Sequence, residues 1–230
     1  MRKKIHIELP NTYRTGYPMT VLTEKKAEDL LRRYVPVAAS VLTKRPEDGK
    51  RFAKKHGYPV VLKIISKQAL HKTDVGGVAI VRNEEELRQT FGRLLTVARK
   101  KKLTLEGVLV QEYVKGQELI IGLKRDAAFG HVLVVGFGGT LVEVLKDVSM
   151  RVCPITPREA DEMLSELRLA KLLDGYRGVP AVNRKLLVKT LVSVSQLPSR
   201  HKRIEEMDIN PFIINEKTGS VADCRIVLRD

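Results

Sequence analysis

Tryptophan is absent from this 230-residue chain, and aromatic residues make up only 5% of it. The two cysteines, Cys153 and Cys224, lie far apart and form no CxxC pair, so neither a disulfide framework nor a zinc site is predicted. No stretch is long and apolar enough to span a membrane, and the N-terminal residues lack the apolar core of a signal peptide. These absences exclude membrane and disulfide-rich secreted classes, so we expect a cytoplasmic protein with no membrane partner.

Positive charge is in large excess. Lys and Arg number 42 against 27 Asp and Glu, which gives a formal net charge of +15. That excess favours a partner that carries phosphate or other acidic groups: a nucleic acid, a nucleotide, a coenzyme or an acidic subunit. The basic runs that begin at Arg2 and Arg99 are short and have no interleaved aromatics, so no nucleic acid is expected. A basic nucleic-acid-binding protein remains the alternative from a different functional class.

Helix and strand patterns alternate through the first half of the chain. After a polar N-terminal arm over residues 1–19, they predict helices over 24–34, 45–57 and 83–102, and strands over 58–65, 76–81 and 106–114. Thr23 and Asn83 are the expected N-caps, the latter with Glu86 in a capping-box arrangement, and Gly57 is the expected helix stop.

The second half predicts more strands than helices. The expected strands cover 117–125, 131–139, 140–145 and 150–155, then a terminal hairpin over 203–215 and 220–228, with helices over 156–173 and 183–197. The fold class is therefore α+β with two lobes, each holding an antiparallel sheet and helices. We place the smaller lobe at 20–110 and the larger at 111–230, a layout that leaves a cleft between them.

The segment "KIISKQALHKTDVGGVAI", which starts at Lys63, places a lysine on a strand made otherwise of Val, Leu and Ile. An unpaired ammonium is costly to bury, so this lysine either reaches water from an edge strand or meets a negative group. The connection that follows is longer than the two to five residues of a tight hairpin, so the extra residues need a function.

That connection carries groups suited to phosphate. It offers an imidazole, a cation, a hydroxyl and paired glycines: His71, Lys72, Thr73, Gly76 and Gly77. Glycines allow the backbone to approach a ligand closely, and loops rich in N–H groups cradle phosphates. No GxxxxGK[ST] or GxGxxG motif is present, so neither a P-loop nor a dinucleotide-binding fold is supported.

Four segments in order carry a family resemblance: "GYPVVLKIISKQALHKTDVGGVAI", "VLVQEYVKGQELIIGLKRDAAFG", "VVGFGGTLVEVLKDVSMRVCPI" and "MDINPFIINEKTG". Together they resemble the ATP-grasp domain of ADP-forming acyl-CoA synthetases, most nearly the short β subunit of ADP-forming acetate–CoA ligase. The resemblance covers roughly residues 20–230. It implies the ATP-grasp fold, with ATP or ADP bound between the two lobes.

The resemblance also implies which residues bind the nucleotide. Around the phosphates it places Lys63, Lys72, Thr73, Gly76 and Gly77. Glu112 and the backbone at Tyr113 and Val114 would meet the adenine edge, and Glu118 would lie near the ribose. Ordinary strand pairing at 112–114 and a solvated carboxylate at Glu118 are the alternatives.

For metal binding and catalysis, Asn210 and Asp223 resemble the family's oxygen ligands for Mg²⁺, a cation held by few protein oxygens and the nucleotide phosphates. Asp208 resembles the acidic residue that orients a phosphorylated histidine from a partner subunit. His71 resembles a second, transient phosphohistidine, because an imidazole nitrogen can accept a phosphoryl group and pass it on. Phosphate binding without covalent transfer is the alternative for His71.

The family's reaction is acyl-CoA + ADP + Pi ⇌ acid + CoA + ATP. No CoA-binding domain and no second glycine-flanked histidine loop is recognisable in the chain, so we expect activity only with a larger α subunit. That subunit would carry the CoA site and the primary phosphohistidine, in an α2β2 heterotetramer. The alternatives within the fold are a succinyl-CoA ligase type and a carboxylate–amine ligase.

Overall fold

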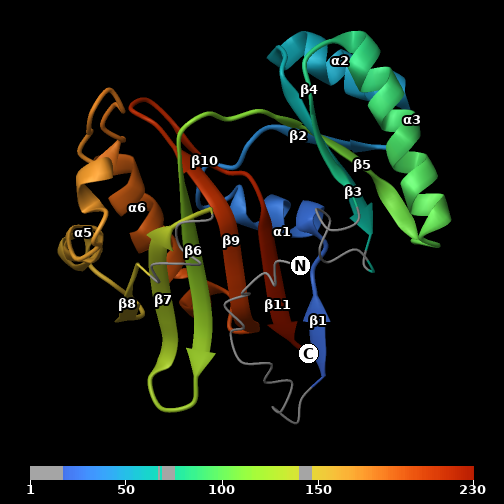
Figure 1. Ribbon diagram of the computed structural model, residues 1–230. Coiled ribbons are helices and arrows are strands. Elements are labelled where there is room, and N and C mark those ends of the chain that lie inside the picture. The colour runs from blue at the N-terminus through green and yellow to red at the C-terminus, as the bar shows by residue number, and fades with distance from the viewer. Residues whose placement is uncertain (1–17, 67, 69–75, 140–146) are drawn as a thin grey trace, which may run out of the picture. The chain divides into compact units, whose positions relative to one another are not determined.

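The computed structural model describes residues 18–66, 68, 76–139 and 147–230, whose helices and strands build two antiparallel sheets (Figure 1). The chain divides into two compact units. The smaller comprises Thr23–Lys26 and Ala38–Val114, and the larger comprises the described residues up to Leu22, Ala27–Val37 and Lys115–Asp230. The predicted α+β class with two antiparallel sheets is confirmed.

The smaller unit is built on a four-stranded sheet in the order β2-β5-β3-β4. Its elements are β2 (Ser40–Thr43), α2 (Pro46–His56), β3 (Val60–Ser66), β4 (Val78–Val81), α3 (Glu84–Lys100) and β5 (Leu105–Glu112). Alternate strand residues such as Leu62 and Val110 pack with Leu87 and Phe91 of α3 in one core. The sheet therefore has one face buried under α2 and α3, and Lys63 belongs to the opposite set of side chains.

Two of the three predicted helix boundaries in this unit are confirmed. The Asn83 side chain accepts a hydrogen bond from the Glu86 backbone N–H, and Gly57 closes α2 with a positive φ of 89°. The third is wrong: Thr23 does not cap α1 (Glu24–Leu31), since its Oγ1 is buried and, among the described residues, has no hydrogen-bond partner. Helix α1 also ends before the predicted Tyr34.

The larger unit holds seven strands, in the order β1-β11-β9-β6-β7-β8 with β10 beside β9. The strands are β1 (Met19–Val21), β6 (Gln117–Asp126), β7 (Gly130–Phe137), β8 (Val148–Val152), β9 (Ile204–Ile214), β10 (Gly219–Val221) and β11 (Cys224–Arg229). The helices are α1 from Ala27 onward, α5 (Pro157–Ser165), α6 (Arg184–Ser195) and the short α7 (Leu197–Arg200). Alternate residues of β6, β7 and β9 pack with α5 and α6 in one core, so the helices cover one face of this sheet (Figure 1).

The terminal hairpin differs from its prediction. Residues 220–228 form two strands, β10 and β11, both paired with β9. At the break between them, Ala222 donates its N–H to the Pro211 carbonyl and Asn210 donates its N–H to the Asp223 carbonyl, each at 3.0 Å. These bonds hold the chain in a bend, so one continuous strand cannot form there.

The predicted helix over 156–173 is also wrong as a single helix. It ends at Ser165 and is followed by a separate 3₁₀ turn, Ala170–Leu172. The buried Asp147 carboxylate accepts the backbone N–H groups of Arg168 at 2.8 Å and Leu169 at 3.0 Å. Because those N–H groups bond a side chain, they do not continue the helical ladder. The predicted strand over 140–145 lies outside the described residues.

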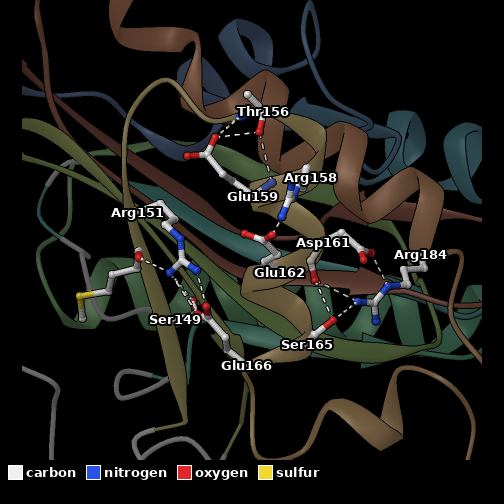
Figure 2. A network of polar contacts seen from close by, with 11 residues as sticks. Ser149, Arg151, Thr156, Arg158, Glu159, Asp161, Glu162, Ser165, Glu166 and Arg184 are labelled. Atoms are coloured by element: carbon white, nitrogen blue, oxygen red, sulfur yellow. Dashed lines mark hydrogen bonds and ion pairs between the residues drawn. The ribbon is translucent and has the colours of Figure 1, made fainter.

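A polar network fixes the helices of the larger unit (Figure 2). Arg184, the first residue of α6, donates to the Asp161 carboxylate at 2.6 Å and to the Ser165 hydroxyl at 2.7 Å. Glu166, just after α5, accepts from Arg151 and Ser149 of β8. The network thus joins α5 to both α6 and the edge of the sheet.

Among the described residues, no helix is long and apolar enough to cross a membrane.

Candidate functional site

Lys63 lies in the interior of the four-stranded sheet. Its strand pairs on both sides, with Lys63 opposite Leu109 of β5 and Val78 of β4. The residue is only 5% exposed, and its Nζ lies 2.8 Å from Oε1 of Glu24. The interpretation of an edge-strand lysine reaching water is therefore wrong, whereas the expected negative partner exists.

Only part of the predicted phosphate loop lies within the described residues. His71, Lys72 and Thr73 lie outside the described residues, and their roles stay predictions. Gly76 has a positive φ of 67°, the left-handed region that favours glycine. Gly77 accepts the Ile64 N–H on its carbonyl at 2.8 Å, so the paired glycines lead the chain back into the sheet beside β3.

The predicted adenine-binding segment follows β5. Glu112 donates its N–H to the Ala39 carbonyl at 2.9 Å, and its Oε2 accepts the Ala39 N–H at 3.4 Å. The strand-pairing alternative thus describes the Glu112 backbone, while Tyr113 and Val114 are half-buried residues beyond the strand. Their contact with adenine stays a prediction.

Glu118, the predicted ribose ligand, is exposed on β6. Its carbonyl accepts the Gly138 N–H at 2.6 Å, and a Cβ added at Gly138 would lie 3.1 Å from that same carbonyl oxygen. Glycine at 138 therefore permits this close approach of β6 to the end of β7. The Glu118 carboxylate itself remains exposed, and its ligand stays a prediction.

Asp208 has a distinctive electrostatic environment on β9. Its register partners are Gly122 of β6 and Arg225 of β11. Burial raises the pKa of its carboxyl from 3.8 to about 6; Arg225 opposes that rise, and the neighbouring Asp223 and Glu206 carboxylates add to it. A carboxyl with a pKa near neutrality is suited to exchanging protons or orienting a charged imidazole.

Asn210 and Asp223 come together at the bend between β10 and β11, where the Asn210 N–H donates to the Asp223 carbonyl at 3.0 Å. An amide oxygen and a carboxylate are hard donors, which Mg²⁺ prefers. No group of three or more His, Cys, Asp or Glu side chains that could hold a metal occurs in the described part of the chain. The pair therefore fits a cation that takes most of its ligands from phosphates and water, and does not fit a fully protein-bound metal.

Sequence reasoning missed three charged residues that lie next to predicted site residues: Glu24 beside Lys63 in the smaller unit, and Glu206 and Arg225 beside Asp208 in the larger one. Glu206 and Asp208 are two apart on one strand, so the strand period places them on the same face. Arg225 could have been matched to them only by knowing the register of β11 against β9.

Comparison with known proteins defines the class. The model of the ATP-grasp domain family matches residues 16–228. The β subunit of the ADP-forming acetate–CoA ligase I of Pyrococcus furiosus is 39% identical over 212 residues, which cover 90% of this chain and 91% of that subunit. The chain therefore belongs to the ATP-grasp family, in the group formed by the β subunits of ADP-forming acetate–CoA ligases and their relatives.

Solved structures agree with this assignment. An acetyl-coenzyme A synthetase of Ca. Korarchaeum cryptofilum, in complex with coenzyme A and Ca-AMPCP, superposes with a TM-score of 0.87 at 39% identity, covering 91% of this chain and 93% of that one. A second structure of that enzyme holds Mg-AMPPCP, with a phosphohistidine segment pointing towards the nucleotide-binding site; its TM-score is 0.79 at 38% identity, with the same coverage. The chain also matches longer ADP-forming acetate–CoA and 4-hydroxybutyrate–CoA ligases, of which it spans about 30% of the length.

Proposed function

We propose that this chain is the nucleotide-binding subunit of an ADP-forming acyl-CoA ligase, acting on acetyl-CoA or a related thioester. The observation that carries the proposal is the match along nearly the full length of a separate β subunit that bears this activity in its name. The overall reaction converts acyl-CoA, ADP and phosphate to the acid, CoA and ATP. In this reaction the chain takes a phosphoryl group from a partner's phosphohistidine and delivers it to ADP.

The phosphoryl group moves in balanced steps. On the larger partner subunit, phosphate displaces CoA from the thioester, and the acyl phosphate then phosphorylates a histidine with release of the acid. The P–N bond to that histidine breaks as a new P–N bond forms to His71. Attack by a β-phosphate oxygen of ADP then breaks the bond to His71 and gives ATP, which regenerates the imidazole.

Two lysines and one carboxylate would form the surroundings of that transfer. Lys63, a buried cation, would contact phosphate oxygens, and Lys72, which lies outside the described residues, would add a second positive charge. Asp208 orients the incoming phosphohistidine by accepting its ring N–H, as carboxylates orient histidines elsewhere. Phosphoryl transfer depends mainly on positioning and on neutralising charge, so two cations and one orienting carboxylate fit the task.

Mg²⁺ would be held by Asn210 and Asp223 together with phosphate oxygens, as their hard oxygen donors allow. When bound, the ion neutralises phosphate charge. Glu112, Tyr113 and Val114 would bind the adenine and Glu118 the ribose, while Thr73, Gly76 and Gly77 would line the phosphates. The partner is a larger α subunit, in an α2β2 assembly.

The phosphohistidine relay is tested in the assembled enzyme. The chain, a candidate α subunit, acetyl-CoA, ³²P-labelled phosphate and Mg²⁺ are incubated without ADP, and acid-labile label is located by mass spectrometry. Label on His71 that disappears when ADP is added supports the relay. His71→Ala tests the same step by substitution, and its matched control is His56→Gln, which alters an exposed histidine at the end of α2.

Two results would contradict the proposal at different levels. Label confined to the α subunit, with His71→Ala forming ATP at the normal rate, removes His71 from the path but leaves the subunit's function intact. Absence of saturable, Mg²⁺-dependent ADP or ATP binding to the chain removes the function itself. Steeply salt-dependent, Mg²⁺-independent binding to generic DNA would instead favour the nucleic-acid alternative.

A further inference from the structure

Glu24 and Lys63 form a buried ion pair inside the smaller unit. Glu24 is the first residue of α1 and Lys63 lies in the middle of β3, with Nζ and Oε1 2.8 Å apart. The two side chains are 3% and 7% exposed, so neither charge is substantially hydrated. The geometry is that of a direct, charge-assisted hydrogen bond.

A contribution to stability does not by itself explain why this ion pair is present. Taking both charges out of water offsets much of their attraction, and apolar side chains of similar size often stabilise a protein equally well. Two apolar neighbours on the same face as Lys63 are buried: Ile65, two positions along β3, and Leu109, its register partner on β5. A Leu or Met at position 63 would therefore suit the sheet, and the presence of a paired cation indicates a use for its charge.

Given the proposed nucleotide site, we infer that Glu24 is a positioning residue for phosphoryl transfer, acting through Lys63. An ammonium group carries three N–H donors, and the bond to Glu24 fixes the direction of one of them. A lysine side chain otherwise has four rotatable bonds and samples many positions. Held by Glu24, the ammonium is placed before the phosphate arrives, and no reorganisation is needed during transfer.

Glu24 also has an opposing electrostatic effect, which makes its role measurable. Its negative charge weakens the attraction of this region for the anionic nucleotide. Neutralising it in Glu24→Gln removes that repulsion but loosens the ammonium. We therefore expect the KM for ADP to stay the same or fall, while kcat falls by roughly ten- to a hundred-fold, the cost of a misplaced group. Glu24→Asp keeps the charge and restores most of kcat.

A merely structural pair gives a different pattern. In that case Glu24→Gln lowers the melting temperature, but kcat and KM per folded molecule stay at their wild-type values, and this result overturns the inference. Lys63→Met is the matched comparison: losing the phosphate contact itself raises the KM for ADP as well as lowering kcat. All four forms are measured as the complex with the α subunit, with the folded fraction determined by circular dichroism.

One measurement needs no variant and decides the matter if Glu24→Gln does not fold. A crystal structure of the wild-type complex with Mg²⁺ and a non-hydrolysable ATP analogue is expected to keep the Glu24–Lys63 bond while Lys63 contacts a phosphate oxygen. A structure in which Lys63 has left Glu24 to reach the nucleotide overturns the inference. Normal kinetics in Lys63→Met would instead overturn the proposed phosphate role of Lys63, so the two failures are distinguishable.

Discussion

Asp208 lies directly opposite Arg225 between β9 and β11, yet the Arg225 guanidinium donates its hydrogen bond to Glu206. Burial raises the pKa of the Asp208 carboxyl from 3.8 to about 6, and the attraction of Arg225 offsets that rise only in part. A carboxyl whose pKa is higher in the folded state binds its proton more tightly there, so its ionisation destabilises the fold as the pH rises from about 4 to 6.

We expect Asp208→Asn to abolish this pH-dependent loss of stability. At pH 7 and above, the variant should unfold with a free energy about 2–3 kcal/mol larger than wild type, since a shift from 3.8 to about 6 corresponds to that order of magnitude. At pH 3.5, where the wild-type carboxyl is mostly protonated in both states, the two proteins should differ little. Urea unfolding at several pH values measures the difference.

Asp126→Asn is the control of opposite sign. Asp126 accepts the backbone N–H groups of Ala128 and Phe129, which lower its pKa. Its ionised form is therefore favoured in the folded protein, and the variant should lose stability at neutral pH but not in acid. Equal pH profiles for both variants would contradict the electrostatic account of Asp208.

The unpaired hydroxyl of Thr23 predicts a gain in stability. Its Oγ1 is buried and makes no hydrogen bond among the described residues, and such a group costs about 1–3 kcal/mol in lost hydration. Thr23→Val should raise the free energy of unfolding by about 1 kcal/mol. Thr190→Val is the matched control, because the Thr190 hydroxyl donates to the Leu186 carbonyl at 2.9 Å, and its loss should not stabilise.

Two glycines predict opposite effects of the same substitution. A Cβ at Gly116 would lie 2.2 Å from the Ile214 carbonyl oxygen, whereas one at Gly92 would meet nothing within 4 Å. Gly116→Ala should therefore destabilise by about 1–3 kcal/mol through overpacking. Gly92→Ala, inside α3, should stabilise by up to about 1 kcal/mol because alanine favours the helix. Thermal unfolding with both variants in parallel tests the contrast.

We expect the arginines of the polar network to contribute unequally to the free energy of unfolding (Figure 2). Arg184 bonds Asp161 and Ser165 and lies 3.5 Å from Asp174, so Arg184→Ala should cost about 1–2 kcal/mol. Within the part of the chain that the structure describes, Arg158 pairs only with Glu162 one turn away, and its side chain is 89% exposed. Arg158→Ala should therefore cost less than about 0.5 kcal/mol. Equal losses in urea unfolding would contradict this ranking.

Local signals in the sequence predicted local structure well. Asn83 with Glu86 marked a helix start correctly, because both partners of the cap lie within one turn. The Val, Leu and Ile run around Lys63 indicated a buried strand, and the paired glycines Gly76 and Gly77 indicated the return to the sheet. The four ordered segments predicted the family and the two-sheet fold.

The predictions that failed concern residues whose interactions are with residues distant in the chain. Glu24 meets Lys63 across 39 positions, and nothing in the local pattern links them. The predicted helix over 156–173 breaks because Asp147 captures N–H groups 21 and 22 positions away. At these two places, long-range pairing overrides local preference. Thr23 has the sequence of an N-cap, yet its hydroxyl is buried and makes no hydrogen bond among the described residues.

The pairing of β1 with β11 has a consequence for synthesis. Thr20 and Asp230, at one end of this pair, are bonded although they lie 210 positions apart. The four-stranded sheet needs only residues 40–112, so it can form while the rest of the chain is still being translated. Strand β1 can join the seven-stranded sheet only after β11 has left the ribosome. Closing a loop of about 200 residues to pair the two strands is slow. Until then β1 is an unpaired strand on the nascent chain, exposed to chaperones and to other copies of itself.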